Sequence, residues 1–402
     1  MNNIKLDFPI LDKKIRDKAI TYLDSAASTQ KPKQVINSIS EFLENSYENV
    51  HRGMNSLSID ATDLYEKSRD VAKNFINSNS TNEIIFTRGA TDSINIIANS
   101  LAEHLKEGDK IVVTELEHHS NYLPWMNLCK KLGLELKIIP ISKDGILSED
   151  DIINNCDDST KVLSLTHMSN VTGQILDIKK IKKSINKDTY VAVDGCQSIA
   201  HLKIDVKDLD CDFYSFSSHK LYGPSGIGIM YGKEDILNKL NPPTLGGGMI
   251  NEVSFNDFSY AMLPNKFEPG TPSIEAAIGF KTAMEYLNNN NYQDYFLNEK
   301  KLRSTLIKAL REFKEVDIYG SNEDGNATSI VSFNIKNQNF NDIATFLDQY
   351  GIMIRGGHHC CQPFMKKLGI PGSCRVSFGI YNDLNDIDHF IDSLKKTLKL
   401  LQ

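Results

Sequence analysis

The sequence lacks an apolar run long enough to cross a bilayer, and residues 1–7 contain no hydrophobic segment of the kind found in signal peptides. It also lacks an excess of positive charge, because 45 Lys and Arg residues stand against 52 Asp and Glu residues and the lysines are scattered. We therefore expect neither a membrane nor a nucleic acid as a partner, and we expect a cytoplasmic location.

Cysteine-based frameworks are absent as well. The seven cysteines form no CxxC pair and no zinc-finger spacing, which indicates reduced thiols rather than disulfides. The chain has no internal repeat and no low-complexity linker. Its 402 residues, 40% of them hydrophobic and 24% charged, have an ordinary globular composition, which excludes disorder and can supply one large core and a smaller domain.

Four short apolar runs, which end near residues 114, 166, 194 and 217, are separated by helical patterns. This alternation predicts an α/β fold with a mostly parallel central sheet and helices on both faces. Further strand-like runs near residues 330 and 352, with a helical stretch between them, predict a smaller α+β unit. We expect a large domain over 20–285 and a small domain formed by 1–19 and 286–402.

Lys220 closely follows the apolar run 213–216, at the end of a predicted strand, where open α/β sheets bind their ligands. A lysine at this position is either a solvated loop residue or one that forms a Schiff base with an aldehyde cofactor such as pyridoxal phosphate (PLP). The run 190–194 ends in Asp194, which can pair with the pyridine nitrogen of PLP or act as a helix cap or turn residue. Together, the two residues favour a PLP site.

Two motifs around these residues carry a resemblance to a known family. Asp194–Gln197 and Ser217–Pro224 resemble the PLP site of the cysteine desulfurases, which are class V aminotransferase-like enzymes. The resemblance extends from Tyr22–Ala27 to Arg375–Ser377, essentially the whole chain, and is closest to the group II, or SufS, type. It implies the fold-type I architecture of PLP-dependent transferases.

The resemblance also implies how the cofactor is held, with Lys220 bonded to it and Asp194 at the pyridine nitrogen. The glycine-containing turn 88–92 leaves N–H groups at the positive end of a helix dipole, which can bind a phosphate or serve packing alone. Taken by itself, each histidine or asparagine near the predicted strand ends can equally be an ordinary loop residue, and His119 has no assigned role. The family assigns the other cofactor contacts to His118 on the ring face, Asn170 and Gln197 at the phenolic oxygen, and Ala90, Thr91, Ser217 and His219 at the phosphate.

Residues 355–363, Arg-Gly-Gly-His-His-Cys-Cys-Gln-Pro, form the densest chemical cluster in the chain. Four consecutive His and Cys residues cannot easily converge on one tetrahedral ion, so we expect no metal site. The remaining alternatives are buried thiols on a tight loop, or a nucleophilic Cys360 whose thiolate is stabilised by positive charge on His359 and Arg355. We expect Cys361 to be a bystander.

The run matches the group II motif Arg-x-Gly-His-His-Cys, in which Cys360 is the nucleophile, and no long insertion precedes it. By this resemblance the loop is restrained, so an acceptor protein is needed to collect the sulfur. Arg375 matches the family arginine that binds the substrate carboxylate with a bidentate fork, although an ion pair on an edge strand would explain it equally. Further substrate contacts are implied for Ala27, Asn170 and Arg355.

The resemblance implies a homodimer. Its interface would include the glycine-rich run 246–250 and the loop 268–272. Thr271 would reach the PLP phosphate of the partner, and Arg52 would border the active site, although each can also be a simple loop residue. The dimer is therefore an expectation from the family and not from the residues.

These features indicate a PLP-dependent cysteine desulfurase. It would convert L-cysteine to L-alanine, leave a persulfide on Cys360 and supply iron–sulfur cluster assembly. Three alternatives stay open: a selenocysteine lyase acting on L-selenocysteine with nearly the same site, a class V aminotransferase that would not need Cys360, and a catalytically silent PLP-binding scaffold.

Overall fold

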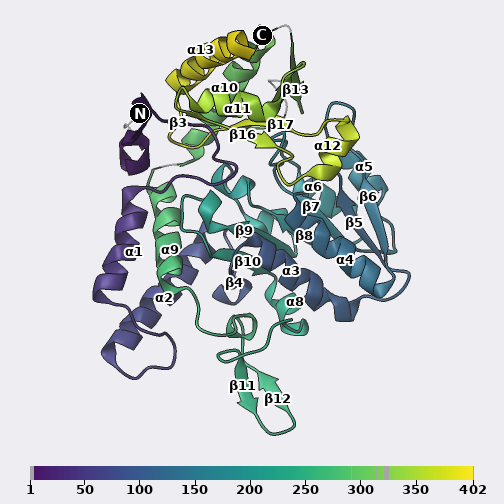
Figure 1. Ribbon diagram of the computed structural model, residues 1–402. Coiled ribbons are helices and arrows are strands. Elements are labelled where there is room, and N and C mark those ends of the chain that lie inside the picture. Colours follow the sequence, from purple (N-terminus) through teal and green to yellow (C-terminus); the bar gives the residue numbers. More distant parts are fainter. Residues whose placement is uncertain (1–3, 291, 314, 321–325, 402) are drawn as a thin grey trace.

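The computed structural model describes residues 4–290, 292–313, 315–320 and 326–401. Its larger part is built on a seven-stranded sheet (Figure 1), whose strands in spatial order are β4 (Ile84–Thr87), β10 (Gly228–Gly232), β9 (Phe213–Ser217), β8 (Tyr190–Asp194), β7 (Thr160–Thr166), β5 (Lys110–Thr114) and β6 (Glu135–Ile139). The strands from β9 to β6 pair in parallel, whereas β10 runs antiparallel to both of its neighbours. The expected mostly parallel sheet is confirmed, with one reversed strand.

Successive residues of the central strands point to opposite faces of the sheet, and helices cover both faces. On β5, Ile111 and Val113 join a core formed with α3 (Ala90–Leu101), α4 (Leu123–Leu132) and α8 (Glu234–Lys239), whereas Val112 joins the core of the other face. Strands that are buried on both faces read as continuous apolar runs, which is why the sequence located them. The second core receives residues from α5 (Glu149–Asn154), α6 (Ile178–Ser184), α7 (Val206–Leu209) and α9 (Ile274–Asn289).

A smaller unit lies above the carboxyl ends of these strands in Figure 1. Its antiparallel sheet contains, in order, β13 (Val316–Tyr319), β14 (Ile330–Ile335), β17 (Ser373–Ser377) and β16 (Arg355–Gly357). A core of its own joins this sheet to α10 (Tyr292–Arg311), α11 (Phe340–Asp348) and α13 (Leu384–Leu401). The α+β unit expected after residue 285 is therefore present, and α12 (Gln362–Leu368) extends from it toward the large sheet.

The N-terminal segment contacts both parts. Phe8 packs edge-on against Tyr222, Tyr286 and Tyr381, and Lys5 Nζ lies 2.8 Å from the Asp386 carboxylate. β3 (Thr21–Tyr22) then pairs in parallel with β15 (Ile352–Met353), the strand expected near residue 352. The domain boundaries at 20 and 285 stay a prediction: residues before 20 join the core of the large sheet, although Lys5 also pairs with Asp386 of the smaller unit.

The remaining elements lie outside the two sheets. α1 (Lys33–Asn45) and α2 (Ser56–Phe75) pack beside α9, the short hairpin β1 (Lys14–Ile15) and β2 (Lys18–Ala19) precedes β3, and the hairpin β11 (Ile250–Val253) and β12 (Phe258–Tyr260) projects from the body (Figure 1). Among the helices of the described ranges, none is both long and apolar enough to span a membrane.

Candidate active site

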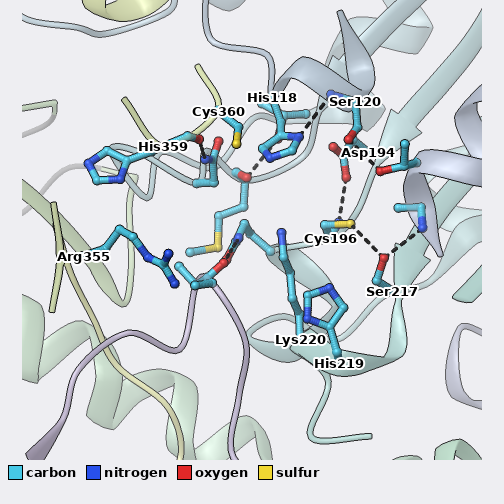
Figure 2. Close-up of a pocket in the computed structure, with 18 of the residues that line it drawn as sticks. His118, Ser120, Asp194, Cys196, Ser217, His219, Lys220, Arg355, His359 and Cys360 are labelled. Atoms are coloured by element: carbon cyan, nitrogen blue, oxygen red, sulfur yellow. Dashed lines mark hydrogen bonds between the residues drawn. The ribbon is translucent and has the colours of Figure 1, made fainter. Parts of the chain in front are cut away.

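A cavity of about 340 Å³ opens at the carboxyl ends of the parallel strands, between the large sheet and the smaller unit. Figure 2 shows Lys220 entering it from one side and Cys360 lying on the other. It collects most of the residues that the sequence singled out: Ala27, Ala90, Thr91, His118, Asn170, Asp194, Gln197, Ser217, His219, Lys220, Arg355, Cys360 and Arg375.

The strand ends form one wall of the cavity. Asp194 is the last residue of β8, and it pairs in register with Ser215 of the neighbouring β9. Lys220 ends the short 3-10 turn that follows β9, so the parallel register brings its amine and the Asp194 carboxylate to the same edge. Asp194 is buried and accepts a hydrogen bond from the Cys196 N–H at 3.0 Å, which fixes the orientation of the carboxylate.

The start of α3 forms a polar corner of this wall. Gly89 has φ +148°, and a Cβ atom there would lie 3.2 Å from Ser217 Oγ, so the close approach of the two segments favours glycine. The Ala90 N–H donates to Ser217 Oγ at 2.8 Å, and the Thr91 and Ser120 hydroxyls share a hydrogen bond of 2.7 Å. A helix N-terminus surrounded by hydroxyl groups is suited to a phosphate.

The two predicted cofactor histidines are neutral. Burial, followed by the Lys220 charge, lowers the pKa of His118 to about 3, and the Ser120 N–H donates to its Nδ1 at 3.1 Å, which leaves the ring hydrogen on Nε2. Burial also lowers the pKa of His219 to about 4. Both rings therefore act as hydrogen-bonding and packing groups and not as positive charges.

Glu117 lies behind His118 and is fully buried. Its carboxyl oxygens accept hydrogen bonds from Thr114 Oγ1 at 2.8 Å and Asn121 Nδ2 at 2.6 Å. Burial, the largest cause, and the nearby Asp194 charge together raise the pKa of this carboxyl to about 8, although the hydrogen bonds lower it. The loop that carries His118 is thus anchored by a buried acid.

Two arginines of the smaller unit share one carboxylate. Asp24 Oδ2 accepts hydrogen bonds from Arg355 Nε at 3.0 Å and Nη2 at 2.7 Å, while Asp24 Oδ1 accepts from Arg375 Nη2 at 3.1 Å. Arg375 is buried and also donates from Nη1 to the Asn170 carbonyl at 3.0 Å. Within the described residues its Nε has no partner, so a buried donor is left for a ligand anion.

Cys360 is the exposed thiol of the chain. All seven cysteines lie in described segments; Cys156 is half-buried and the other five are buried. Cys360 and His359 have φ of +53° and +52°, a left-handed conformation that costs about 1–2 kcal/mol for each non-glycine residue. This strained turn presents the thiol to the cavity (Figure 2).

The expected positive charge on His359 is wrong. The ring is buried, its Nε2 lies 3.0 Å from Ser373 Oγ, and burial followed by the Arg375 charge lowers its pKa to about 2. Arg355 therefore remains as the cation of the predicted pair, and it is already paired with Asp24. Cys361 points elsewhere, with Sγ buried 3.7 Å from the Glu115 carbonyl and a pKa raised by burial.

The two predicted amide contacts to the cofactor already have protein partners. Asn170 Nδ2 donates to the His359 carbonyl at 2.7 Å, and Gln197 Nε2 donates to the Ala26 carbonyl at 2.8 Å. Their roles toward the phenolic oxygen stay a prediction. Thr271 lines a separate cavity of about 400 Å³ and does not line the first one.

Sequence reasoning missed several residues that line or support the cavity. Ser120, Thr166, Met168 and Cys196 line it without an assigned role. Asp24 was recognised only as part of a motif, because its two arginine partners lie 331 and 351 residues away. A single sequence contains no local signal for such pairs. Among the described residues, no group of three His, Cys, Asp or Glu side chains is arranged to hold a metal ion.

Comparison with known proteins gives consistent matches. The family model "Aminotransferase class-V" matches residues 21–390. A probable cysteine desulfurase of Staphylococcus epidermidis is 44% identical over 97% of this chain and 95% of its own length, and one of Staphylococcus aureus is 42% identical over 99% and 96%. Among solved structures, the Escherichia coli cysteine desulfurase CsdA has a TM-score of 0.91 at 33% identity, covering 100% of this chain and 99% of its own. An apo cysteine desulfurase of Thermococcus onnurineus has a TM-score of 0.93 at 36% identity, covering 99% and 98%.

Proposed function

The chain belongs to the class V aminotransferase family and, within it, to the cysteine desulfurases, and from this premise we propose that it converts L-cysteine to L-alanine with a persulfide on Cys360. The observation that carries the proposal is the shared cavity, in which the exposed Cys360 thiol faces Lys220 beside the buried Arg375. An aminotransferase has no need for the exposed thiol. A selenocysteine lyase would use nearly the same site, so both amino acids belong in the test.

PLP is the cofactor of these enzymes, and the cavity fits it. Within the described residues, the Lys220 amine has no hydrogen-bond partner, and the buried Asp194 carboxylate faces the same space. The polar start of α3 offers N–H and hydroxyl groups to a phosphate. The residues that would hold the cofactor are Lys220, Asp194, His118, Ala90, Thr91, Asn170, Gln197, Ser217 and His219.

When bound, PLP supplies an electron-withdrawing ring that lowers the cost of removing the proton from the substrate Cα. Asp194 would keep the ring nitrogen protonated, and the neutral His118 would pack against the ring. Arg375 binds the substrate carboxylate, for which its unpartnered Nε is available. Lys220 Nζ then acts as the base at Cα.

The Cys360 thiolate attacks the sulfur of the substrate, so that a sulfur–sulfur bond forms and the Cβ–sulfur bond breaks. The electron pair of the broken bond stays with the three-carbon fragment, which takes up protons and leaves as alanine. The sulfur becomes the outer atom of the Cys360 persulfide. The step needs no external oxidant or reductant, because Cβ is reduced by the same two electrons that the sulfur atom loses.

We also propose an acceptor protein of iron–sulfur cluster assembly and a homodimer. The acceptor is supported by the position of Cys360, which is exposed at the cavity but held in a restrained turn. The dimer is supported by Thr271, which does not line the cavity of its own chain and so is available to a neighbour. The cytoplasmic location stays a prediction from the sequence.

The test uses purified protein with L-cysteine, L-selenocysteine and a reductant. We expect a yellow holoenzyme that releases alanine and sulfide in equal amounts, and a Cys360→Ser variant that stays yellow but releases neither. If the variant keeps sulfide release, or if the holoenzyme transfers amino groups without sulfide, the assignment is wrong. Faster turnover of L-selenocysteine that survives in Cys360→Ser would identify a selenocysteine lyase.

A further inference from the structure

The turn that carries Cys360 does not hold itself in place. His359 and Cys360 are both left-handed non-glycine residues, and such a conformation persists only where the surroundings enforce it. Inside the turn, His358 Nδ1 accepts the Cys360 N–H at 3.0 Å, and the His358 carbonyl accepts the Cys361 N–H at 2.9 Å. His358 is itself exposed, so further support has to come from outside the turn.

That support comes from two loops of the large-sheet part. Asn170 Nδ2 donates to the His359 carbonyl at 2.7 Å, and the His119 N–H donates to the Cys360 carbonyl at 2.7 Å. The His119 residue begins the 3-10 turn that follows β5, on the loop that also carries His118. The backbone of one histidine loop is therefore bonded directly to the nucleophile residue.

The His119 side chain adds a second contact. Its Nε2 accepts the Gln362 N–H at 3.2 Å, across 243 residues of sequence. Gln362 is the first residue of α12, and the N-cap residue Cys361 makes no side-chain capping bond. Pro363, the second residue of the helix, has no N–H to be capped. The imidazole therefore does for α12 what a capping side chain normally does.

The geometry requires a neutral His119 ring with its hydrogen on Nδ1, because a protonated Nε2 cannot accept the Gln362 N–H. Burial, followed by the charge of His358, lowers the pKa of His119, which agrees with this requirement. The His119 and His358 rings also lie 5.6 Å apart in a tilted contact, so the ring meets both ends of the turn.

We propose that His119 is a positioning residue for the sulfur-transfer step: it caps α12 from the loop that follows β5 and so fixes the Cys360 turn in its reactive orientation. The inference rests on the proposed function of Cys360. It predicts that His119 contributes to turnover and not to substrate binding. Arg375 is held by Asp24 and the Asn170 carbonyl, and Lys220 is positioned by the 3-10 turn after β9, so neither depends on His119.

The experiment compares His119→Ala, His119→Gln and, as a matched control, His104→Ala, which removes an exposed histidine far from the cavity. Glutamine places an amide oxygen that can accept the Gln362 N–H, so it tests rescue by hydrogen bonding alone. Three quantities are measured on the holoenzymes: hydrogen exchange of the 358–365 segment, the rate at which iodoacetamide alkylates Cys360, and kcat with KM for L-cysteine.

For His119→Ala we expect faster exchange in this segment, a changed alkylation rate at Cys360, and a kcat lowered about 5-fold with KM nearly unchanged, the size of one lost hydrogen bond. His119→Gln should recover most of each value, and His104→Ala should match the wild type. The proposal is overturned if His119→Ala matches His104→Ala in exchange and alkylation, or if glutamine rescues nothing.

Exchange and alkylation do not depend on desulfurase activity. If the wild type releases no alanine while His119→Ala still loosens the segment and glutamine restores it, the desulfurase assignment fails and the capping contact stands. If the wild type is active and the variant loses neither order nor turnover, the positioning role fails and the desulfurase assignment stands.

Discussion

On one wall of the cavity, Asp194 and Ser217 are the last residues of two neighbouring parallel strands, whereas on the opposite wall Cys360 lies in a left-handed turn. These strand ends are buried, and main-chain hydrogen bonds to the neighbouring strands hold them in place. The Cys360 turn is exposed and depends on side chains and carbonyls from distant segments, above all His119 and Asn170.

The difference matches the two tasks of the site. A cofactor has to be held in one orientation in a dry environment, and strand ends in a packed sheet provide that. A sulfur that leaves for another molecule has to be reachable, and a turn at the surface provides that at a cost in strain. Variants on the two walls should therefore fail in different ways.

The largest effect is expected on the strand wall. Lys220→Ala removes both the link to the cofactor and the base at Cα, so alanine formation should fall by about 10³-fold or more. Borohydride reduction should attach PLP to the wild type and not to the variant, which mass spectrometry detects. If Lys220→Ala kept more than a few per cent of the activity, Lys220 would be neither the link to the cofactor nor the base at Cα.

The next largest effect is expected at Arg375, the proposed binding residue for the substrate carboxylate. Arg375→Lys loses the planar fork, so KM for L-cysteine should rise roughly 10- to 150-fold, the loss of about one charged hydrogen bond. Asp24→Asn should give a smaller rise, because it weakens the hold on Arg375 without removing it. The exposed Arg88→Lys serves as the control. An unchanged KM in Arg375→Lys would mean that another group binds the carboxylate.

A third prediction concerns the stability of the strand wall. Because the pKa of Glu117 is raised from 4.5 to about 8, the folded protein holds a proton there that the unfolded chain releases. The resulting stability is fully present below about pH 4.5 and is lost as the pH rises through 8, with a slope of up to about 1.4 kcal/mol per pH unit. Urea unfolding at pH 5 and pH 8 should show this loss in the wild type and a weaker loss in Glu117→Gln. If the unfolding free energy depended on pH equally in the wild type and in Glu117→Gln, the raised pKa would not belong to Glu117.

The smallest effect is expected beside the nucleophile. Cys361 is buried and bonded to the Glu115 carbonyl, so Cys361→Ser should retain alanine formation within about 2-fold while the unfolding free energy falls by about 1–3 kcal/mol. Cys360→Ser should show the reverse pattern, with lost activity and unchanged stability. If the two serine variants lost activity equally, the distinction between the adjacent thiols would be wrong.

Much of the strand wall was predictable, because its signals are local. The runs ending at Thr114, Thr166, Asp194 and Ser217 are apolar on both faces, and parallel strands bring their carboxyl ends to one edge. The reversed strand β10 and the edge strand β6 were not identified. The hydrophobic periodicity of a single strand does not specify which neighbouring strand it pairs with or in which direction.

The sequence by itself determined the parallel strands that end at Thr114, Thr166, Asp194 and Ser217, the residue types at their ends and the chemical identity of the Cys360 run. Only the tertiary structure decided that Asp24 holds Arg355 and Arg375, that His359 is neutral and that His119 caps α12. The reason is physical: periodicity acts over a few residues, whereas burial, charge state and contacts between segments hundreds of residues apart exist only once the two parts of the fold have packed together.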